Sequence, residues 1–191
     1  SRRGNRNAAL SLEKPMIQIN APQEPATLDK PVDHLNACHR RIEQRLDTLE
    51  RVIPHLCSRT EESLAAVHGV FHFLDSNGLL HTEDEEQSLF PRLLDKINPA
   101  DRARIDALEE YHDRSHALYQ HLKSIHYTFC SRPCPELAAE YQETVEKLTA
   151  LYRSHIERED ALFPKLAALY LDDVQLRVIS DEMKRRRGQA C

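Results

Sequence analysis

Apolar residues recur at three- and four-residue steps along most of the chain beyond residue 30, a period that predicts amphipathic helices. The first predicted helix begins near Pro31, with Asp33 as a candidate N-cap, and ends before Pro54, because proline interrupts a continuing helix. One face of this helix carries a regular series of residues: Leu35, His39, Ile42, Leu46, Leu49 and Ile53.

Three further helical stretches follow. The second covers residues 58–94, and Asn77-Gly78 interrupts its pattern, which predicts either one kinked helix or two collinear pieces. Asn98–Asp101 is a turn followed by an N-cap, and it opens a third helix that ends before Pro133. The fourth helix begins at Pro135 and carries its apolar series through Leu166.

Amphipathic stretches joined by short connections bury their apolar faces most economically in a bundle. The predicted fold class is therefore all-α, an antiparallel up-down-up-down four-helix bundle over residues 31–187. Within it, residues 171–187 form a short C-terminal fifth helix that packs across one end. Residues 1–30 are polar and contain three prolines, which predicts a flexible N-terminal arm, and residues 188–191 form a tail.

Composition agrees with long helices and disfavours two classes of function. The 191 residues are 40% hydrophobic and 30% charged, with four Gly and no Trp, which suits helices better than a sheet. The net charge of −5 gives no general attraction to nucleic acid. Since no apolar run approaches the roughly 20 residues that span a bilayer, we expect a soluble, cytoplasmic protein. The first residue is Ser rather than Met, which leaves an upstream export signal open.

The five cysteines, at positions 38, 57, 130, 134 and 191, are an odd number without the density of a disulfide-stapled domain. Such usage is typical of a reducing compartment, so we expect mostly free thiols. Cys130 and Cys134 lie close together and could form a disulfide or bind a metal, but three residues between cysteines in a proline-containing loop is a weak signal for either.

Polar residues with metal-binding side chains interrupt the apolar stripes. His39 falls in phase with Leu35 and Ile42 on the first helix. The other three helices each carry a pair of such residues at a spacing of four, which places both on one helical face. These pairs are His81 with Glu85, His112 with His116, and His155 with Glu159.

Ionised carboxylates inside a bundle cost several kcal/mol each unless a cation compensates them. Five imidazoles and two carboxylates are too many donors for one tetrahedral zinc ion. They suit two octahedral metal ions bridged by the carboxylates and a solvent oxygen.

The chain also contains an internal repeat. The segment from His81 to Leu-Phe-Pro at 89–91 resembles the segment from His155 to Leu-Phe-Pro at 162–164, which is one residue shorter. The spans from His39 to His81 and from His112 to His155 are nearly equal. This repetition predicts two helical hairpins related by a pseudo-two-fold axis around a shared site.

With these residues and with Cys-His-Arg-Arg-Ile at 38–42, the chain resembles the hemerythrin-like family over residues 31–187. The resemblance implies a di-iron centre with an oxo or hydroxo bridge that binds or reacts with O2 or a related small diatomic or peroxide ligand. Carried onto this sequence, it implies imidazole ligands and bridging carboxylates as follows: His39, His81, His112, His116 and His155, with Glu85 and Glu159 as the bridges.

The function implied by this resemblance has two forms. The favoured one is a non-catalytic module for O2 binding, or for oxygen or redox sensing. The alternative is a di-iron enzyme that decomposes peroxide or consumes nitric oxide, or a protein for iron storage or repair. The sequence leaves the choice open, and with it the metal bound in vivo and the oligomeric state.

For several ligand assignments, a nearby residue is an alternative candidate. Asp160 and Glu86 are substitutes for Glu159 and Glu85, and His34 competes with His39 although it lies off the apolar stripe. The remaining histidines of the helices, His68, His72, His121 and His126, are expected to be surface or partly packed residues. Tyr111, Tyr119 and Tyr152 are expected to be core aromatics that could also line the pocket.

Overall fold

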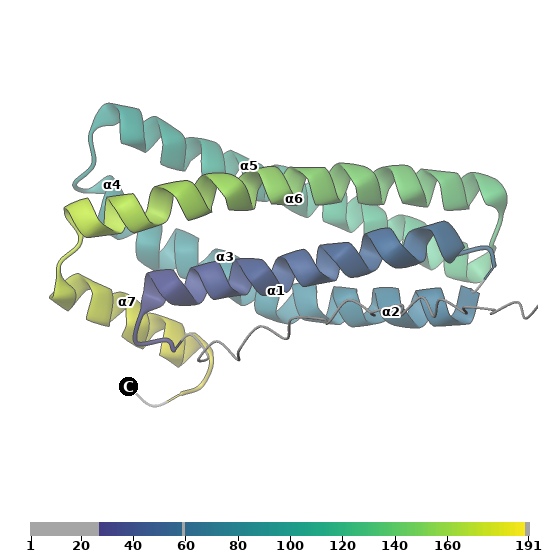
Figure 1. Ribbon diagram of the computed structural model, residues 1–191, viewed down its shortest axis with the longest axis horizontal. Coiled ribbons are helices and arrows are strands. Elements are labelled where there is room, and N and C mark those ends of the chain that lie inside the picture. The colour runs from purple at the N-terminus through teal and green to yellow at the C-terminus, as the bar shows by residue number, and fades with distance from the viewer. Residues whose placement is uncertain (1–26, 59, 190–191) are drawn as a thin grey trace, which may run out of the picture.

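The computed structural model describes residues 27–58 and 60–189, and within these ranges it contains helices and no strand. The all-α prediction is therefore confirmed. Figure 1 shows long helical stretches lying side by side along the molecule, with α7 set apart across one end. The structure describes only residues 27–30 of the predicted N-terminal arm, and Leu28 among them is buried against the bundle.

Helix α1 (Pro31–Val52) continues into a short 3₁₀ turn, η1 (Ile53–His55), so the helix ends where Pro54 predicts. The predicted cap differs, because Lys30 occupies the N-cap and Asp33 lies in the first turn. Beyond the second stretch, the long helices are α5 (Pro99–Ser131) and α6 (Pro135–Tyr170), followed by α7 (Asp173–Arg186). Asn98 caps α5 by accepting hydrogen bonds from the amides of Ala100 and Asp101.

The second stretch is one continuous run of helix with two wide π turns. It consists of α2 (Thr60–Phe73), η2 (Leu74–Gly78), α3 (Leu79–Asp84), η3 (Glu85–Leu89) and α4 (Phe90–Leu94). A π turn accommodates one additional residue in a helix, and such turns are frequent at functional sites. The turn η3 lies where the first Leu-Phe-Pro segment has one residue more than the second, and it absorbs that residue.

The core consists of two large apolar clusters at opposite ends of the bundle. One contains Leu56, Phe129 and Tyr141 near the α1–α2 and α5–α6 connections, and the other contains Phe90, Phe163 and Met183 near α7. A small group of Ile42, Leu46 and Ile156 lies between them. Buried polar residues also interrupt the core, as described below.

Ion pairs connect helix α7 to the bundle. Asp84 is fully buried and accepts hydrogen bonds from Arg186 at 2.8 Å and from Arg187 at 2.7 Å. Arg92 donates two further bonds to the carboxylate of Glu182. These contacts hold α7 against the end of α3 and the start of η3, next to the predicted ligand Glu85.

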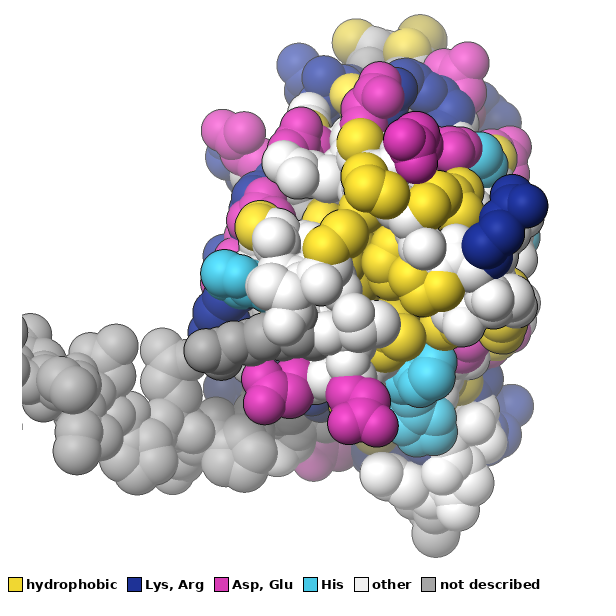
Figure 2. Space-filling view, turned by 90° about the vertical axis from the view of Figure 1, so that its right-hand side faces the viewer, with side chains coloured by type: hydrophobic (Ala, Val, Ile, Leu, Met, Phe, Trp, Pro, Cys, Tyr) yellow, Lys and Arg dark blue, Asp and Glu magenta, His cyan; other side chains and the backbone are white. Residues whose placement is uncertain are grey.

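Figure 2 shows the end of the bundle that carries the α1–α2 and α5–α6 connections, where apolar side chains gather at the surface and charged side chains surround them. Among the helices of the described residues, no stretch is both long enough and apolar enough to cross a membrane.

The aromatic pair at the α7 end of the core provides a test of packing. Phe90 and Phe163 are fully buried, and their rings meet edge to face at 5.7 Å. Replacing Phe163 with alanine removes a filled volume from a close-packed interior. We expect Phe163→Ala to lower the free energy of unfolding of the metal-free protein by about 3–5 kcal/mol in a denaturant titration.

The control for this substitution is Leu169→Ala, because the side chain of Leu169 is 73% exposed. Its effect should stay within about 0.5 kcal/mol. Equal losses in the two variants would contradict the assignment of Phe163 to the core.

Candidate metal centre

Six of the seven predicted ligand residues meet in the middle of the bundle. They form two groups of four, and within each group the candidate ligand atoms all lie within 4.8 Å of one another. Both groups contain Glu85 and Glu159, which are the residues they share. The first group adds His39 from α1 and His81 from α3, and the second adds His112 from α5 and His155 from α6.

Each carboxylate faces an imidazole from its own helical stretch. The Nε2 atom of His81 lies 3.2 Å from an oxygen of Glu85, and that of His155 lies 2.9 Å from an oxygen of Glu159. Both contacts follow from the spacing of four residues, which places the two side chains one above the other.

Each carboxylate also faces an imidazole from a different helix. The Nε2 atom of His39 lies 3.0 Å from Glu159, and that of His112 lies 3.3 Å from Glu85. Since both carboxylates are fully buried, the four helices bring their charges to one enclosed point.

The acidic residues that follow the two buried glutamates have a different position. The Nδ1–H of His39 donates to Asp160 at 2.6 Å, and the Nδ1–H of His112 donates to Glu86 at 2.7 Å. Asp160 is also paired with Arg40. These contacts fix the ring orientation and turn Nε2 toward the centre, as carboxylate partners of metal-binding histidines commonly do.

The two halves of the centre have similar ring contacts. The rings of His39 and His81 meet edge to face at 4.7 Å and 79°, and those of His112 and His155 do so at 4.6 Å and 70°. The pairs Glu85-Glu86 and Glu159-Asp160 make equivalent contacts, because the first residue of each pair faces the centre and the second hydrogen-bonds to a histidine. The sequence reasoning missed this second role for Glu86 and Asp160, although their position directly after each ligand candidate is the signal that marks them.

Unsatisfied polar atoms test whether a cation fits here. Among residues 27–58 and 60–189, eight buried side-chain nitrogen or oxygen atoms lack a hydrogen-bond partner, and seven of them belong to this centre. All four oxygens of Glu85 and Glu159 are included. Buried polar atoms are normally paired, so a concentration of unpaired acceptors at one point indicates a binding site for positive charge. The residues present therefore fit a metal cation.

Protonated imidazoles provide this positive charge in the absence of a cation. Burial by itself would lower the pKa of His39, but the hydrogen bond to Asp160 and the nearby carboxylates of Glu159 and Glu85 outweigh it and raise the pKa to about 11. For His112, contacts with Glu85 likewise outweigh burial and raise the pKa to about 9. Burial would raise the pKa of Glu85, yet the surrounding histidines hold it well below its usual range.

Two predicted residues lie elsewhere. His116 is exposed and belongs to neither group of four, so the structure does not bring it to the centre. Its role as a ligand stays a prediction. His34, the rival of His39, is buried one turn earlier on α1, where its Nε2 lies 3.5 Å from the sulfur of Cys38.

A pocket of about 400 Å³ opens onto one side of the centre. His81, His112 and His155 line it, whereas His39 does not. The side chain of His39 is fully enclosed. Further lining residues come from η2, α5 and α6, and they include Asp75, Gly78, Ser115, His116, Tyr119 and Tyr152.

An all-helical fold with histidine and carboxylate side chains converging inside it defines a cation-binding helical protein. Comparison with known families agrees, because residues 30–166 match the hemerythrin HHE cation binding domain. The chain therefore belongs to the hemerythrin HHE family, and the resemblance predicted from the sequence is confirmed.

The chain is also similar to an uncharacterized protein of Haemophilus influenzae (strain ATCC 51907 / DSM 11121 / KW20 / Rd). The two are 28% identical over 155 residues, which cover 77% of this chain and 84% of the relative. The family match ends at residue 166, so α7 lies beyond it.

The hydrogen bond from His39 to Asp160 generates a prediction. Asp160→Asn removes the charge that orients this imidazole and leaves every atom of the two groups of four in place. We expect iron affinity to fall by about 10–100-fold in a chelator competition assay.

The matched control is Asp47→Asn, because Asp47 is an exposed residue of α1 that pairs only with Arg153 among the contacts described. Its iron affinity should equal that of the unsubstituted protein. If Asp160→Asn also leaves the affinity unchanged, Asp160 has no part in positioning His39.

Proposed function

We propose that this protein is a non-haem di-iron protein that binds O2 or a related small oxidant, as an oxygen-binding or sensing module. The observation that carries the proposal is the sharing of Glu85 and Glu159 by both groups of four. Carboxylates common to two sets of imidazoles suit two adjacent cations, whereas a single cation would leave part of the donor set unused.

Iron is the metal that the donor set favours. Each half offers two imidazole nitrogens and access to both carboxylates, without a thiolate. Mixed nitrogen and oxygen donors are typical of non-haem iron proteins, while thiolates would favour zinc or copper. Solvent would complete the coordination of the metal ions that these residues hold.

The arrangement of the helices supports the same proposal. We infer the antiparallel up-down-up-down order of the family, in which α1 and α2–α4 form one hairpin and α5 and α6 form the other. Each hairpin then contributes a carboxylate and two imidazoles, and each holds the back of a histidine from the other hairpin through Glu86 or Asp160.

In this proposal the residues of the chain have distinct tasks. His39 and His81 hold one half, in which His39 is enclosed and His81 borders the pocket, and His112 and His155 hold the other half, where both border the pocket. Glu85 and Glu159 keep both halves together. A bound iron pair supplies reversible exchange of electrons with an oxidant, and the pocket beside His112 and His155 is the route by which a small oxidant reaches it.

A second candidate function, a di-iron enzyme that reduces peroxide or consumes nitric oxide, is favoured by the pocket itself. Its volume exceeds what a diatomic molecule needs, and Ser115, His116 and Tyr152 supply proton donors along its walls. Burial raises the pKa of Tyr152 to about 12, so its hydroxyl stays protonated at neutral pH and can donate a hydrogen bond to an oxidant.

The spectrum of the reduced, iron-loaded protein distinguishes the two functions. On stopped-flow mixing with O2, a binding or sensing protein should develop a stable optical band that disappears when O2 is removed. Rapid decay of that band, with continued consumption of added peroxide, would instead identify the enzyme.

Removal of a shared carboxylate tests the two-metal arrangement. Since Glu85 belongs to both groups, we expect Glu85→Ala to lower the iron content per chain to about half or less, measured by metal analysis after anaerobic reconstitution. Glu140→Ala is the matched control, because Glu140 is an exposed glutamate of α6 that belongs to neither group of four, and its iron content should match that of the unsubstituted protein.

Full iron loading of Glu85→Ala would remove this residue from the ligand set. A loss of iron in His116→Ala would show instead that His116 is a ligand. Circular dichroism on all three variants establishes that the helices remain.

The entry route can be tested by filling the pocket. Ser115 is half-buried in the pocket wall, and its hydroxyl donates a hydrogen bond to the main-chain carbonyl of His112 at 3.0 Å. We expect Ser115→Leu to slow oxidation of the reduced centre by a bulky alkyl hydroperoxide more than oxidation by O2, because the added side chain narrows the pocket. Iron content should not change.

Stopped-flow rates for Ser115→Ala provide the comparison, because this substitution removes the hydroxyl without filling the space. If both oxidants react with Ser115→Leu as fast as with the unsubstituted protein, the oxidant reaches the centre by another route.

A further inference from the structure

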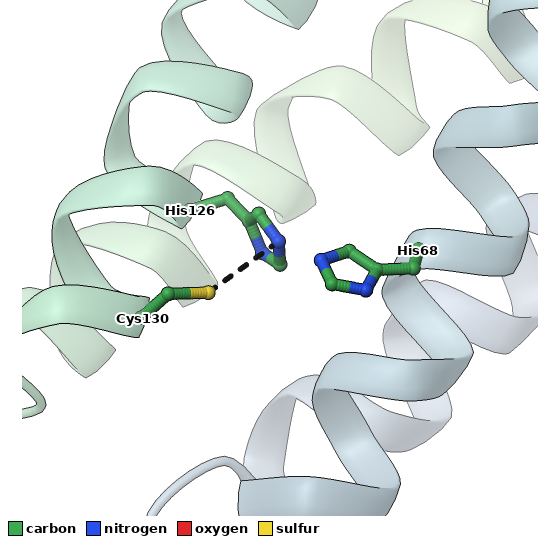
Figure 3. Close-up of side chains that lie close together, drawn as sticks. All are labelled: His68, His126 and Cys130. Carbon is green, nitrogen blue, oxygen red and sulfur yellow. Dashed lines mark hydrogen bonds between the residues drawn. The ribbon is translucent and has the colours of Figure 1, made fainter.

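A second cluster of metal-binding side chains lies outside the centre described above. His68 on α2 and His126 and Cys130 on α5 have their candidate ligand atoms within 4.8 Å of one another. Figure 3 shows His68 extending from one helix toward His126 and Cys130 on the other. None of the three belongs to the family centre, and the sequence patterns leave each of them without a role.

The two α5 residues face the same way because they are four positions apart. His126 is buried, with 1% of its surface exposed, whereas Cys130 is exposed. The Nε2 atom of His126 lies 3.6 Å from the sulfur of Cys130. The buried histidine therefore presents a nitrogen toward a thiol that solvent can reach.

A tyrosine fixes the orientation of the His126 ring. Its Nδ1 lies 2.8 Å from the hydroxyl oxygen of Tyr141, which is fully buried on α6. With the proton on Nδ1, the ring donates to Tyr141 and the lone pair of Nε2 points toward Cys130. Phe71 packs against the same ring at 5.0 Å and limits its rotation. An outer hydrogen bond and close packing are the usual supports of a metal-binding histidine.

Burial also keeps His126 in the form that binds metals. Desolvation and the neighbouring His68 lower its pKa to about 4, so the imidazole is neutral at physiological pH. The ring of His68 meets that of His126 edge to face, with the two ring centroids 4.8 Å apart. The ring of His68 is exposed, which allows it to adjust toward a bound ion.

The spacing of these donors suits a tetrahedral cation. With metal–nitrogen and metal–sulfur bonds of the lengths usual for zinc, a ligand nitrogen and a ligand sulfur lie about 3.6 Å apart. The distance between His126 Nε2 and Cys130 Sγ already has this value. The third donor, on His68, comes from another helix, and its ligand atom lies within 4.8 Å of the other two.

We propose that His68, His126 and Cys130 bind a single zinc-class cation, Zn²⁺ itself or a close analogue, with a water molecule as fourth ligand. On binding, the Cys130 thiol releases its proton to solvent and the sulfur coordinates as thiolate. The bound ion would join α2 to α5 and remain accessible from solvent. The thiolate also separates this site from the iron centre, whose groups contain only imidazoles and carboxylates.

The test uses the full-length, iron-loaded protein and Co²⁺ as the probe. Co²⁺ replaces zinc in tetrahedral sites and gives a sulfur-to-cobalt charge-transfer band only when a thiolate is a ligand. A titration recorded as difference spectra should show this band and saturate at a single added ion per chain. Competition with Zn²⁺ should then abolish the band.

Variants identify the donors. Cys130→Ser should eliminate the charge-transfer band, and His68→Gln should weaken Co²⁺ binding by roughly 100-fold or more, since a direct ligand contributes at least as much as an outer partner. Both side chains are exposed, so these substitutions leave the buried core unchanged. The matched controls are Cys57→Ser and Cys134→Ser, which remove other free thiols and should retain the band.

Three results would overturn the proposal. They are the absence of the band in the unsubstituted protein, its persistence in Cys130→Ser, and Co²⁺ affinity in His68→Gln equal to that of the unsubstituted protein. A band that disappears in Cys57→Ser or Cys134→Ser would also overturn it, because another thiol would then be the ligand. Iron content, measured on each variant, shows that the family centre is intact throughout.

Discussion

The rest of the structure depends on the burial of two carboxylates, Glu85 and Glu159, at one point between the helices. Burial of a carboxylate is energetically costly unless positive charge compensates it. None of the four oxygens of these carboxylates has a hydrogen-bond partner. Four imidazoles surround the carboxylates, and protonation of His39 and His112 supplies charge when no cation is bound. The interior is thus arranged to bind cations, and a large apolar cluster lies toward each end of the bundle.

The two halves of the centre are alike in contacts but differ in surroundings. Each pair of a histidine and a glutamate spaced four residues apart faces a histidine from another helix, and the acidic residue after that glutamate hydrogen-bonds to the far side of the same histidine. The π turn η3 makes this likeness possible, because it absorbs the additional residue of the first hairpin and returns Phe90 to a position opposite Phe163. The pocket makes the two halves unequal, because it reaches both His112 and His155 in one half but only His81 in the other, where His39 stays enclosed. A small ligand therefore has one side of approach.

Helix α7 connects the stability of the fold to the centre. It lies beyond the part of the chain that matches the family, yet its two arginines pair with Asp84, the residue directly before Glu85. Loss of one partner from an ion pair at a fully buried carboxylate strongly destabilises a fold. The pairing with Asp84 therefore restrains the adjacent backbone from which Glu85 extends. The His68, His126 and Cys130 cluster shows a similar use of the scaffold, since Tyr141 from α6 orients a histidine of α5 toward α2.

The sequence by itself determined the helical class, the approximate bounds of the helices and the residue types of the centre. These follow from periodicity and from spacings of four, which are local properties of one helix. Only the tertiary structure decided which carboxylate of each neighbouring pair faces inward. Consecutive residues point about 100° apart around a helix, and which of the two directions is inward depends on where the other helices pack. For the same reason the tertiary structure left His116 at the surface, although its spacing from His112 is as good as that of His155 from Glu159. The convergence of His68 with His126 and Cys130 joins residues about 60 positions apart on two helices, and no local pattern contains it.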